Sequence, residues 1–157
     1  MKSKIKPYAI SIIIALAVGG LSAFLTRNSM DIYEELITPP LSPPSILFPI
    51  VWTILYVLMG ISAAMIYIDK LAPFKERSSA LATYASSLIV NFSWSIIFFN
   101  FRAFLLAFIW LLFLMFLIIK TIISYKNIRP IAAYLQIPYV IWVAFAGYLN
   151  FSIWILN

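Results

Sequence analysis

The sequence lacks cysteine and histidine altogether, and only 10% of its 157 residues are charged. Without cysteine there is no disulfide and no thiol nucleophile. Without either residue, most zinc and copper sites and the usual axial ligand of haem iron are excluded, so we expect no metal and no cofactor. Ordinary soluble domains have about 25% charged residues. The chain therefore has too little polar surface to be a soluble globule.

Hydrophobic residues instead make up 64% of the sequence, and most of them lie in long uncharged runs. A helix needs about 18 apolar residues to cross the roughly 30 Å hydrocarbon core of a bilayer. Runs of about this length or longer occupy residues 8–26, 45–68, 78–101, 103–119 and 130–157. The sequence therefore predicts an all-α membrane protein, in which a bundle of five transmembrane helices forms one domain over residues 1–157.

The first span and the link between the third and fourth are the least regular parts of this pattern. The first follows three lysines and could also be a cleaved signal peptide, with Gly20 and Ser22 at the cleavage site. Its apolar run is longer than a typical signal core, which favours a membrane helix. Only Arg102 separates the third and fourth spans, so we expect a very tight turn there.

The basic residues predict the orientation, because cytoplasmic loops of membrane proteins are enriched in lysine and arginine. With the N-terminus in the cytoplasm, only Arg27 and Arg102 face outwards. The other nine are cytoplasmic, namely Lys2, Lys4, Lys6, Lys70, Lys75, Arg77, Lys120, Lys126 and Arg129. We expect a bacterial plasma-membrane protein with an external C-terminus and an external loop over residues 27–44 that can act as a lid. Because the basic residues are scattered singly, the net charge of +6 does not indicate a nucleic-acid partner.

The acidic residues lie outside the predicted spans. All five are in the two longer loops, namely Asp31, Glu34, Glu35, Asp69 and Glu76. Ionisable groups inside spans mark ion pathways, and tuned ionisable groups act as acid–base catalysts. Spans without a carboxylate argue against ion-coupled transport and against a conventional enzymatic active site.

Aromatic and weakly polar side chains recur at helical spacing in three of the spans. They are Phe48, Trp52, Met59 and Ala63 in the second, Tyr84, Ser87, Asn91, Trp94 and Phe98 in the third, and Pro138, Trp142, Phe145 and Leu149 in the fifth. Together these faces could enclose one aromatic cavity. The alternative is that the aromatic residues anchor or pack the helices and that Asn91 only bonds a neighbouring helix. Pro138 also predicts a kink or a locally widened turn, because it lacks the amide that would bond the carbonyl of Tyr134.

Small residues spaced four apart indicate close helix contacts. Gly60 and Ala64 in the second span, and Ala82 and Ser86 in the third, have this spacing. The pattern fits contacts within the bundle or between the subunits of a homodimer, and it does not distinguish them.

Three ordered segments resemble the translocator protein family, which includes the tryptophan-rich sensory proteins and the former peripheral benzodiazepine receptors. The first segment comprises Tyr33, Leu36, Pro39, Pro43, Pro44, Phe48, Val51-Trp52-Thr53, Leu55-Tyr56 and Met59-Gly60. The second comprises Asn91, Trp94-Ser95 and Phe98-Phe99. The third comprises Ile137-Pro138-Tyr139, Trp142, Phe145-Ala146, Tyr148-Leu149-Asn150, Ile153-Trp154 and Leu156-Asn157. The match covers nearly the whole chain.

The resemblance implies a five-helix bundle, often dimeric, that binds tetrapyrroles such as protoporphyrin IX or similar hydrophobic ligands beneath the first loop. By matching position, the site would be lined by Tyr33, Pro43, Phe48, Trp52, Asn91, Trp142 and Ala146. We expect a function in sensing or regulating porphyrin levels, with the ligand and membrane lipid as partners. Two alternatives remain open: light- and oxygen-dependent porphyrin degradation, with Trp52 and Trp142 as catalytic residues, and facilitated tetrapyrrole transport.

The charge of such a ligand raises a further question. Protoporphyrin carries two propionates, which are costly to bury unpaired and should lie near a cation at the cavity mouth. On the external side only Arg27 and Arg102 are available. Their planar guanidinium groups could bind these carboxylates, or they could simply anchor helix ends at the headgroups.

Overall fold

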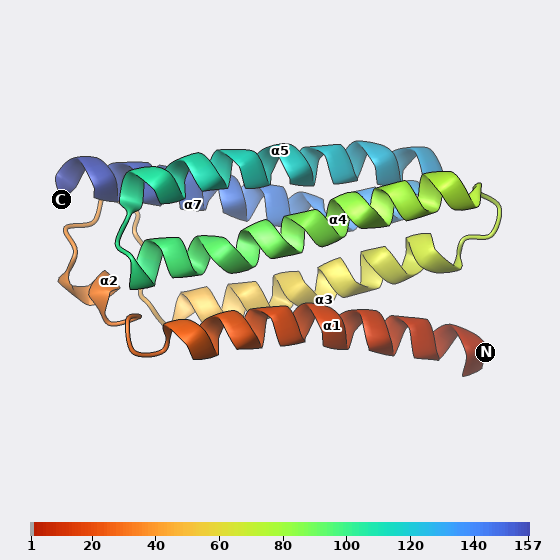
Figure 1. The fold of residues 1–157 in the computed structure, drawn as a ribbon, viewed down its shortest axis with the longest axis horizontal. Coiled ribbons are helices and arrows are strands. Elements are labelled where there is room, and N and C mark those ends of the chain that lie inside the picture. The colour runs from red at the N-terminus through yellow and green to blue at the C-terminus, as the bar shows by residue number, and fades with distance from the viewer. Residues whose placement is uncertain (1) are drawn as a thin grey trace.

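The computed structural model describes residues 2–157 and contains no β-strand in that range. Its helices are α1 (Lys2–Thr26), α2 (Ile32–Glu35), α3 (Leu47–Ile68), α4 (Phe74–Ser95), the π-helical segment η1 (Ile96–Asn100), α5 (Phe104–Ile128), α6 (Pro130–Leu135) and α7 (Ile137–Leu156). Within the described chain, five segments are long and apolar enough to cross a membrane: α1, α3, α4 with η1, α5, and α6 with α7. The predicted all-α membrane fold is confirmed. The two ends of the chain lie at opposite ends of the bundle (Figure 1), as expected for a chain with an odd number of membrane-spanning helices.

Three helices extend beyond the apolar runs that predicted them: α1, which begins at Lys2 rather than at residue 8, and α4 and α5. Helix α4 begins at Phe74 rather than at residue 78, and α5 continues to Ile128 rather than ending at residue 119. The added turns contain Lys75, Glu76, Arg77, Lys120 and Lys126. Straight-chain charged residues are good helix formers, and their long side chains can reach the lipid headgroups. Each helix therefore continues beyond its hydrophobic run.

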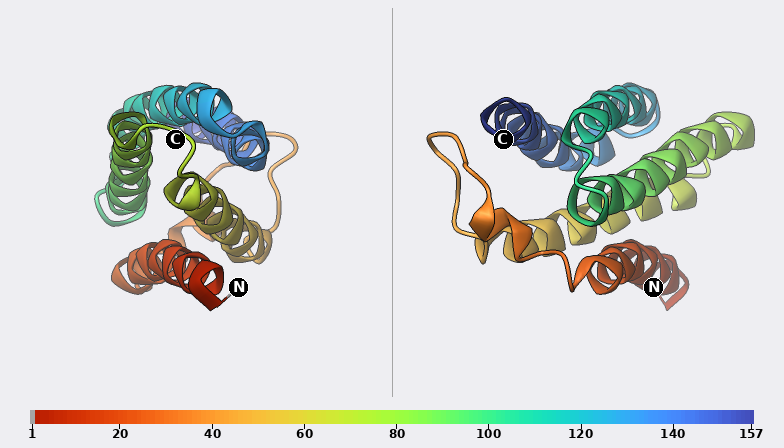
Figure 2. Two further views of the ribbon diagram at one scale, coloured as in Figure 1. Left: turned by 90° about the vertical axis from the view of Figure 1, so that its right-hand side faces the viewer. Right: turned by 60° about the vertical axis from the view of Figure 1, so that its left-hand side comes forward.

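The helices pack so that α5 contacts α4 as well as α6 and α7. Helix α1 packs along α3 and also contacts α4, while α3 contacts α6. The loop over residues 27–46, which contains α2, connects α1 to α3 at the end of the bundle that holds the C-terminus (Figure 2). We call this loop the lid, because it has the position expected of one.

Glycine allows α1 and α3 to approach closely. A Cβ atom added to Gly60 of α3 would lie 2.5 Å from the Cα atom of Ile12, and one added to Gly19 of α1 would collide with the ring of Tyr56. The missing side chains therefore permit the short distance between these helices. Of the two uses that the sequence leaves open for Gly60, the structure shows the contact within the bundle.

The fifth span is broken at Gln136, two residues before Pro138, since α6 ends at Leu135 and α7 begins at Ile137. The buried side chain of Gln136 donates a hydrogen bond from Nε2 to the Oγ atom of Ser62 at 2.7 Å. The irregularity predicted from Pro138 is therefore present, and a polar contact with α3 stabilises it.

The connection from α4 to α5 is as tight as predicted. Segment η1 ends at Asn100 and α5 begins at Phe104. Between them, Arg102 has a positive φ of 52°, which is uncommon for a residue other than glycine. Asn100 donates a hydrogen bond from Nδ2 to the carbonyl oxygen of Leu25 at 3.1 Å, which joins the turn to the end of α1.

Candidate ligand-binding cavity

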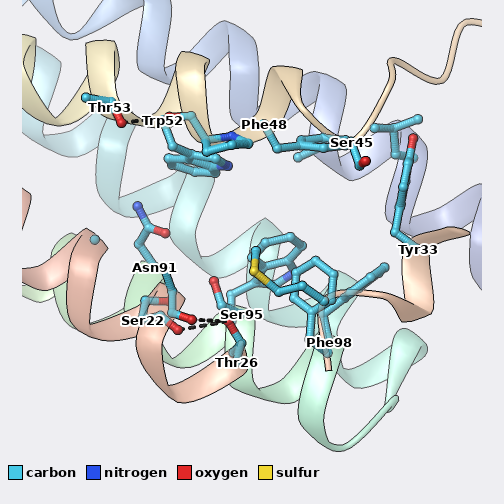
Figure 3. Close-up of a pocket in the computed structure, with 18 of the residues that line it drawn as sticks. Ser22, Thr26, Tyr33, Ser45, Phe48, Trp52, Thr53, Asn91, Ser95 and Phe98 are labelled. Atoms are coloured by element: carbon cyan, nitrogen blue, oxygen red, sulfur yellow. Dashed lines mark hydrogen bonds between the residues drawn. The ribbon is translucent and has the colours of Figure 1, made fainter. Parts of the chain in front are cut away.

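A cavity of about 530 Å³ lies at the lid end of the bundle (Figure 3). Its size falls within the range of roughly 300–1,000 Å³ that is usual for small-molecule sites. Helices α1, α3, α4 and α7, segment η1 and the lid all contribute to its lining. Eight of the residues that the sequence singles out for a cavity line it: Tyr33, Phe48, Trp52, Asn91, Trp94, Phe98, Ala146 and Leu149.

Aromatic side chains face each other across the cavity. Trp52 and Phe48 of α3 form one wall, opposite Asn91 of α4 and Phe98 of η1 (Figure 3). The ring centroid of Trp94 lies 5.3 Å from that of Phe98, so the second wall is aromatic as well. Flat aromatic surfaces on both sides suit a planar apolar ligand, which can stack on each of them.

Buried and partly buried hydrogen bonds hold the second wall in place. The indole Nε1 of Trp94 donates to Asn150 Oδ1 at 3.1 Å, and Asn150 Nδ2 donates to the carbonyl oxygen of Phe104 at 2.8 Å. Asn91 donates from Nδ2 to the hydroxyl of Tyr139 at 3.0 Å. Asn91 therefore has both roles considered for it, since it bonds another helix and also lines the cavity.

Pro43, Trp142 and Phe145 do not line the cavity, contrary to expectation. Trp142 packs edge-to-face with Phe48, at 5.8 Å between ring centroids, and beside Phe145 at 5.6 Å. Trp142 therefore supports the cavity wall through Phe48. Only the C-terminal half of α7 lines the cavity. Helical spacing predicts that the α7 candidates share a face of the helix, but it does not predict how far along the helix the cavity extends.

The wall formed by α1 is not predicted from the sequence. It consists of Leu16, Gly19, Gly20, Ser22, Ala23 and Thr26. Most of these side chains are small, and small residues leave space that bulkier ones would fill. The cluster of small residues around position 20, in an otherwise bulky apolar run, is the available signal, and the signal-peptide interpretation assigns it to a cleavage site instead.

Hydrogen bonds from α7 fasten the lid at the end of the bundle. The hydroxyl of Tyr148 donates to the carbonyl oxygen of Pro40 at 2.8 Å. Asn157 bonds both backbone groups of Ile37: its Oδ1 accepts from the amide at 3.1 Å, and its Nδ2 donates to the carbonyl at 2.9 Å. Tyr148 of α7 and Asn157, directly after α7, thus hold the lid at two points.

Tyr33 joins the lid to the cavity wall. Its hydroxyl donates to the carbonyl oxygen of Pro43 at 2.9 Å, and its ring packs edge-on against Phe48 at 5.1 Å between centroids. Burial raises the pKa of the Tyr33 hydroxyl, so the group keeps its proton and remains a donor at neutral pH. Pro43 therefore contributes by orienting Tyr33, although its own side chain does not line the cavity.

A family model and several relatives match nearly the whole chain. The model of the TspO/MBR family covers residues 11–155. The chain belongs to the TspO/MBR family. It is 34% identical over 158 residues to Tryptophan-rich protein TspO of Chlorobaculum tepidum, a match that covers 100% of this chain and 99% of that protein. It is 33% identical to Protein CrtK of Rhodobacter capsulatus, with 96% and 92% of the two chains covered. It is 34% identical to Translocator protein of Bos taurus, with 87% and 81% covered.

The motif-based resemblance is thereby confirmed, and the chain is an integral membrane protein of this family.

The cavity of this TspO/MBR protein has an acidic mouth. Asp31 and Glu34 of the lid belong to the lining, whereas no lysine or arginine does in the part of the chain that the structure describes. Arg27 donates from Nη1 to the carbonyl oxygen of Phe24 at 2.6 Å, and its guanidinium lies 3.9 Å from the centre of the Phe24 ring. Neither Arg27 nor Arg102 therefore reaches the cavity as a partner for a ligand carboxylate.

Proposed function

We propose that this protein binds a planar hydrophobic ligand of the tetrapyrrole class, such as protoporphyrin IX or a haem-like compound, in the cavity beneath the lid. We further propose that binding serves to sense or regulate porphyrin levels. The observation that carries the proposal is the pair of facing aromatic walls, formed by Trp52 and Phe48 on one side and by Trp94 and Phe98 on the other. Membership of the TspO/MBR family supports the same ligand class.

The lining suits such a ligand in two respects. An extended macrocycle offers two flat faces, and each aromatic contact of suitable geometry contributes roughly 0.5–1.5 kcal/mol beyond burial of area. The polar groups of the second wall are already bonded within the protein, as Trp94 is to Asn150 and Asn91 is to Tyr139. The ligand therefore needs few polar atoms of its own in the depth of the cavity.

Replacing Trp52 by leucine should weaken protoporphyrin IX binding by about three- to tenfold, because the ligand loses one stacking surface. Quenching of tryptophan fluorescence or a shift of the porphyrin absorption bands in detergent measures the affinity. The matched control is Trp154→Leu, at an exposed position near the end of α7, where affinity should not change. Wild-type affinity in Trp52→Leu would show that Trp52 only packs the bundle.

The same titrations separate binding from the two other activities considered. Stable porphyrin bands under illumination in air are expected for binding alone, whereas their loss in light would indicate oxidative degradation. If degradation occurs, Trp52 is the better candidate for a direct role, because Trp142 does not line the cavity. Uptake of porphyrin into sealed vesicles that contain the protein would instead indicate facilitated transport.

We also infer that the N-terminus is cytoplasmic and that the lid and the cavity mouth face the external side. The distribution of lysine and arginine supports this orientation. A periplasmic reporter such as alkaline phosphatase, fused after Asn157, should therefore be active. If only a cytoplasmic reporter is active at the same position, the C-terminus is cytoplasmic and the orientation is the opposite of the one inferred.

A further inference from the structure

We propose that the cavity recognises a metal-loaded tetrapyrrole through a water molecule bound to the metal. This axial water would hydrogen-bond the polar side chains opposite Trp52, namely Ser22, Asn91 and Ser95. The proposal rests on the tetrapyrrole function proposed above and narrows its ligand class. The site would favour macrocycles whose metal takes an axial ligand, such as zinc(II), over those whose metal is square-planar.

The three polar side chains share one side of the cavity. Ser22 of α1 and both Asn91 and Ser95 of α4 belong to the lining. Asn91 and Ser95 are four residues apart, so they lie on the same face of α4. Figure 3 shows the three residues across the cavity from Trp52 and Phe48. A planar ligand stacked on Trp52 by one face would therefore turn its other face toward polar groups.

Ser22 is buried and has no internal partner for its hydroxyl group. Only 5% of this residue is exposed, and its Oγ atom makes no hydrogen bond within residues 2–157. The other buried serine and threonine hydroxyls donate to carbonyl oxygens of their own helices; they belong to Thr26, Ser62, Ser87 and Thr121. An unpaired buried hydroxyl is unfavourable. The free hydroxyl at this cavity therefore indicates that a bound molecule supplies its partner.

Asn91 and Ser95 provide further oxygen atoms for the same partner. Asn91 donates from Nδ2 to the hydroxyl of Tyr139 at 3.0 Å, which orients its amide group. Neither Asn91 Oδ1 nor Ser95 Oγ takes part in a hydrogen bond within the described chain, although both residues line the cavity. A metal-bound water is a strengthened donor, because the cation withdraws charge from its O–H bonds. Several acceptors on one wall suit such a water.

The composition of the chain supports water as the axial ligand. Zinc(II) in a porphyrin is held by the ring nitrogens and takes a further ligand on one face. The sequence has no histidine or cysteine to fill this position. Among the described residues there is also no cluster of ligating side chains that would bind a metal ion by itself. The metal would therefore enter with the macrocycle, and the protein would contact it through the water.

The test compares zinc(II) protoporphyrin IX with palladium(II) protoporphyrin IX. The two complexes share the same ring and the same propionates, but square-planar palladium(II) takes no axial ligand. The variants are Ser22→Ala and Ser95→Ala, with Ser86→Ala as the matched control. Ser86 is exposed on α4, does not line the cavity and donates to the carbonyl oxygen of Ala82 at 2.9 Å. Quenching of tryptophan fluorescence measures each affinity.

A thioether sulfur can also coordinate a metal, and Met30 is part of the lining. The absorption bands of the zinc complex should move to longer wavelength in the wild-type cavity, as they do when the metal gains an axial ligand. Met30→Leu should leave this shift unchanged. Loss of the shift in Met30→Leu would identify sulfur as the ligand and overturn the inference.

We expect Ser22→Ala and Ser95→Ala each to lower the affinity for the zinc complex about two- to tenfold, because each removes a hydrogen bond to the water. The affinity for the palladium complex should not change, and Ser86→Ala should change neither. The band shift of the zinc complex should shrink in the double variant. Equal losses for both metals, or no loss for either, would contradict the inference. Failure of both complexes to bind wild-type protein would instead refute the proposed function.

Discussion

Replacing Ala146 by phenylalanine should lower the affinity for protoporphyrin IX at least about tenfold, which corresponds to roughly 1.4 kcal/mol. Ala146 is only 7% exposed and lines the cavity from α7. An added phenyl ring has no outward path from this buried position, so it would occupy the space that the ligand needs. Fluorescence or absorption titration of the purified variant measures the loss.

The control for this experiment is Ala144→Phe. Residues two apart on a helix point in nearly opposite directions, and Ala144 is exposed on the outer face of α7. The same ring added there should leave binding unchanged. If Ala146→Phe and Ala144→Phe both bind protoporphyrin IX as tightly as wild type, the ligand does not occupy this cavity.

Among the substitutions proposed here, replacing Gly60 by valine should cause the largest loss of thermal stability. The new Cβ would lie 2.5 Å from the Cα atom and 2.8 Å from the backbone nitrogen of Ile12. Backbone atoms cannot rotate away as a side chain can, so α1 would have to shift from α3. Overpacking of this kind costs typically about 1–3 kcal/mol. For a chain of this length, each kcal/mol lowers the midpoint of thermal unfolding by about 2–4 °C, so the midpoint should fall by about 2–12 °C.

Gly147→Val provides the comparison at a second helical glycine. A Cβ at Gly147 would have no heavy atom within 4 Å, so valine there should change the melting temperature far less. Circular dichroism during heating in detergent measures both variants. Because α1 forms one wall of the cavity, Gly60→Val should also weaken porphyrin binding. Equal melting temperatures for the two variants would mean that the contact of α1 with α3 is not tight.

Local chemistry was sufficient to predict several details of the chain path. The tight turn follows from the short interval around Arg102, and the break in the last span follows from the missing amide of Pro138. The hydrophobic runs predict helices α4 and α5 that are shorter than the observed ones, because such a run marks only the part of a helix inside the bilayer. Polar turns beyond the bilayer continue each helix with residues of good helix propensity.

The site was harder to predict than the fold. Helical spacing predicts the aromatic residues of α3 and α4 that line the cavity, but it also predicts Trp142 there, which lies behind Phe48. The sequence does not predict the wall formed by the small residues of α1, since an empty volume beside Gly19 and Gly20 depends on what packs opposite them. The acidic mouth likewise depends on the path of the lid, which turns Glu34 toward Ser45.

The sequence by itself determined the membrane fold and the positions of its five spans. It did so because a bilayer requires an apolar stretch of set length from every helix, whatever that helix packs against. Only the tertiary structure decided which side chains meet in one cavity and which charges stand at its mouth. In a membrane helix the faces toward lipid and toward protein are both apolar, so periodicity alone cannot separate them.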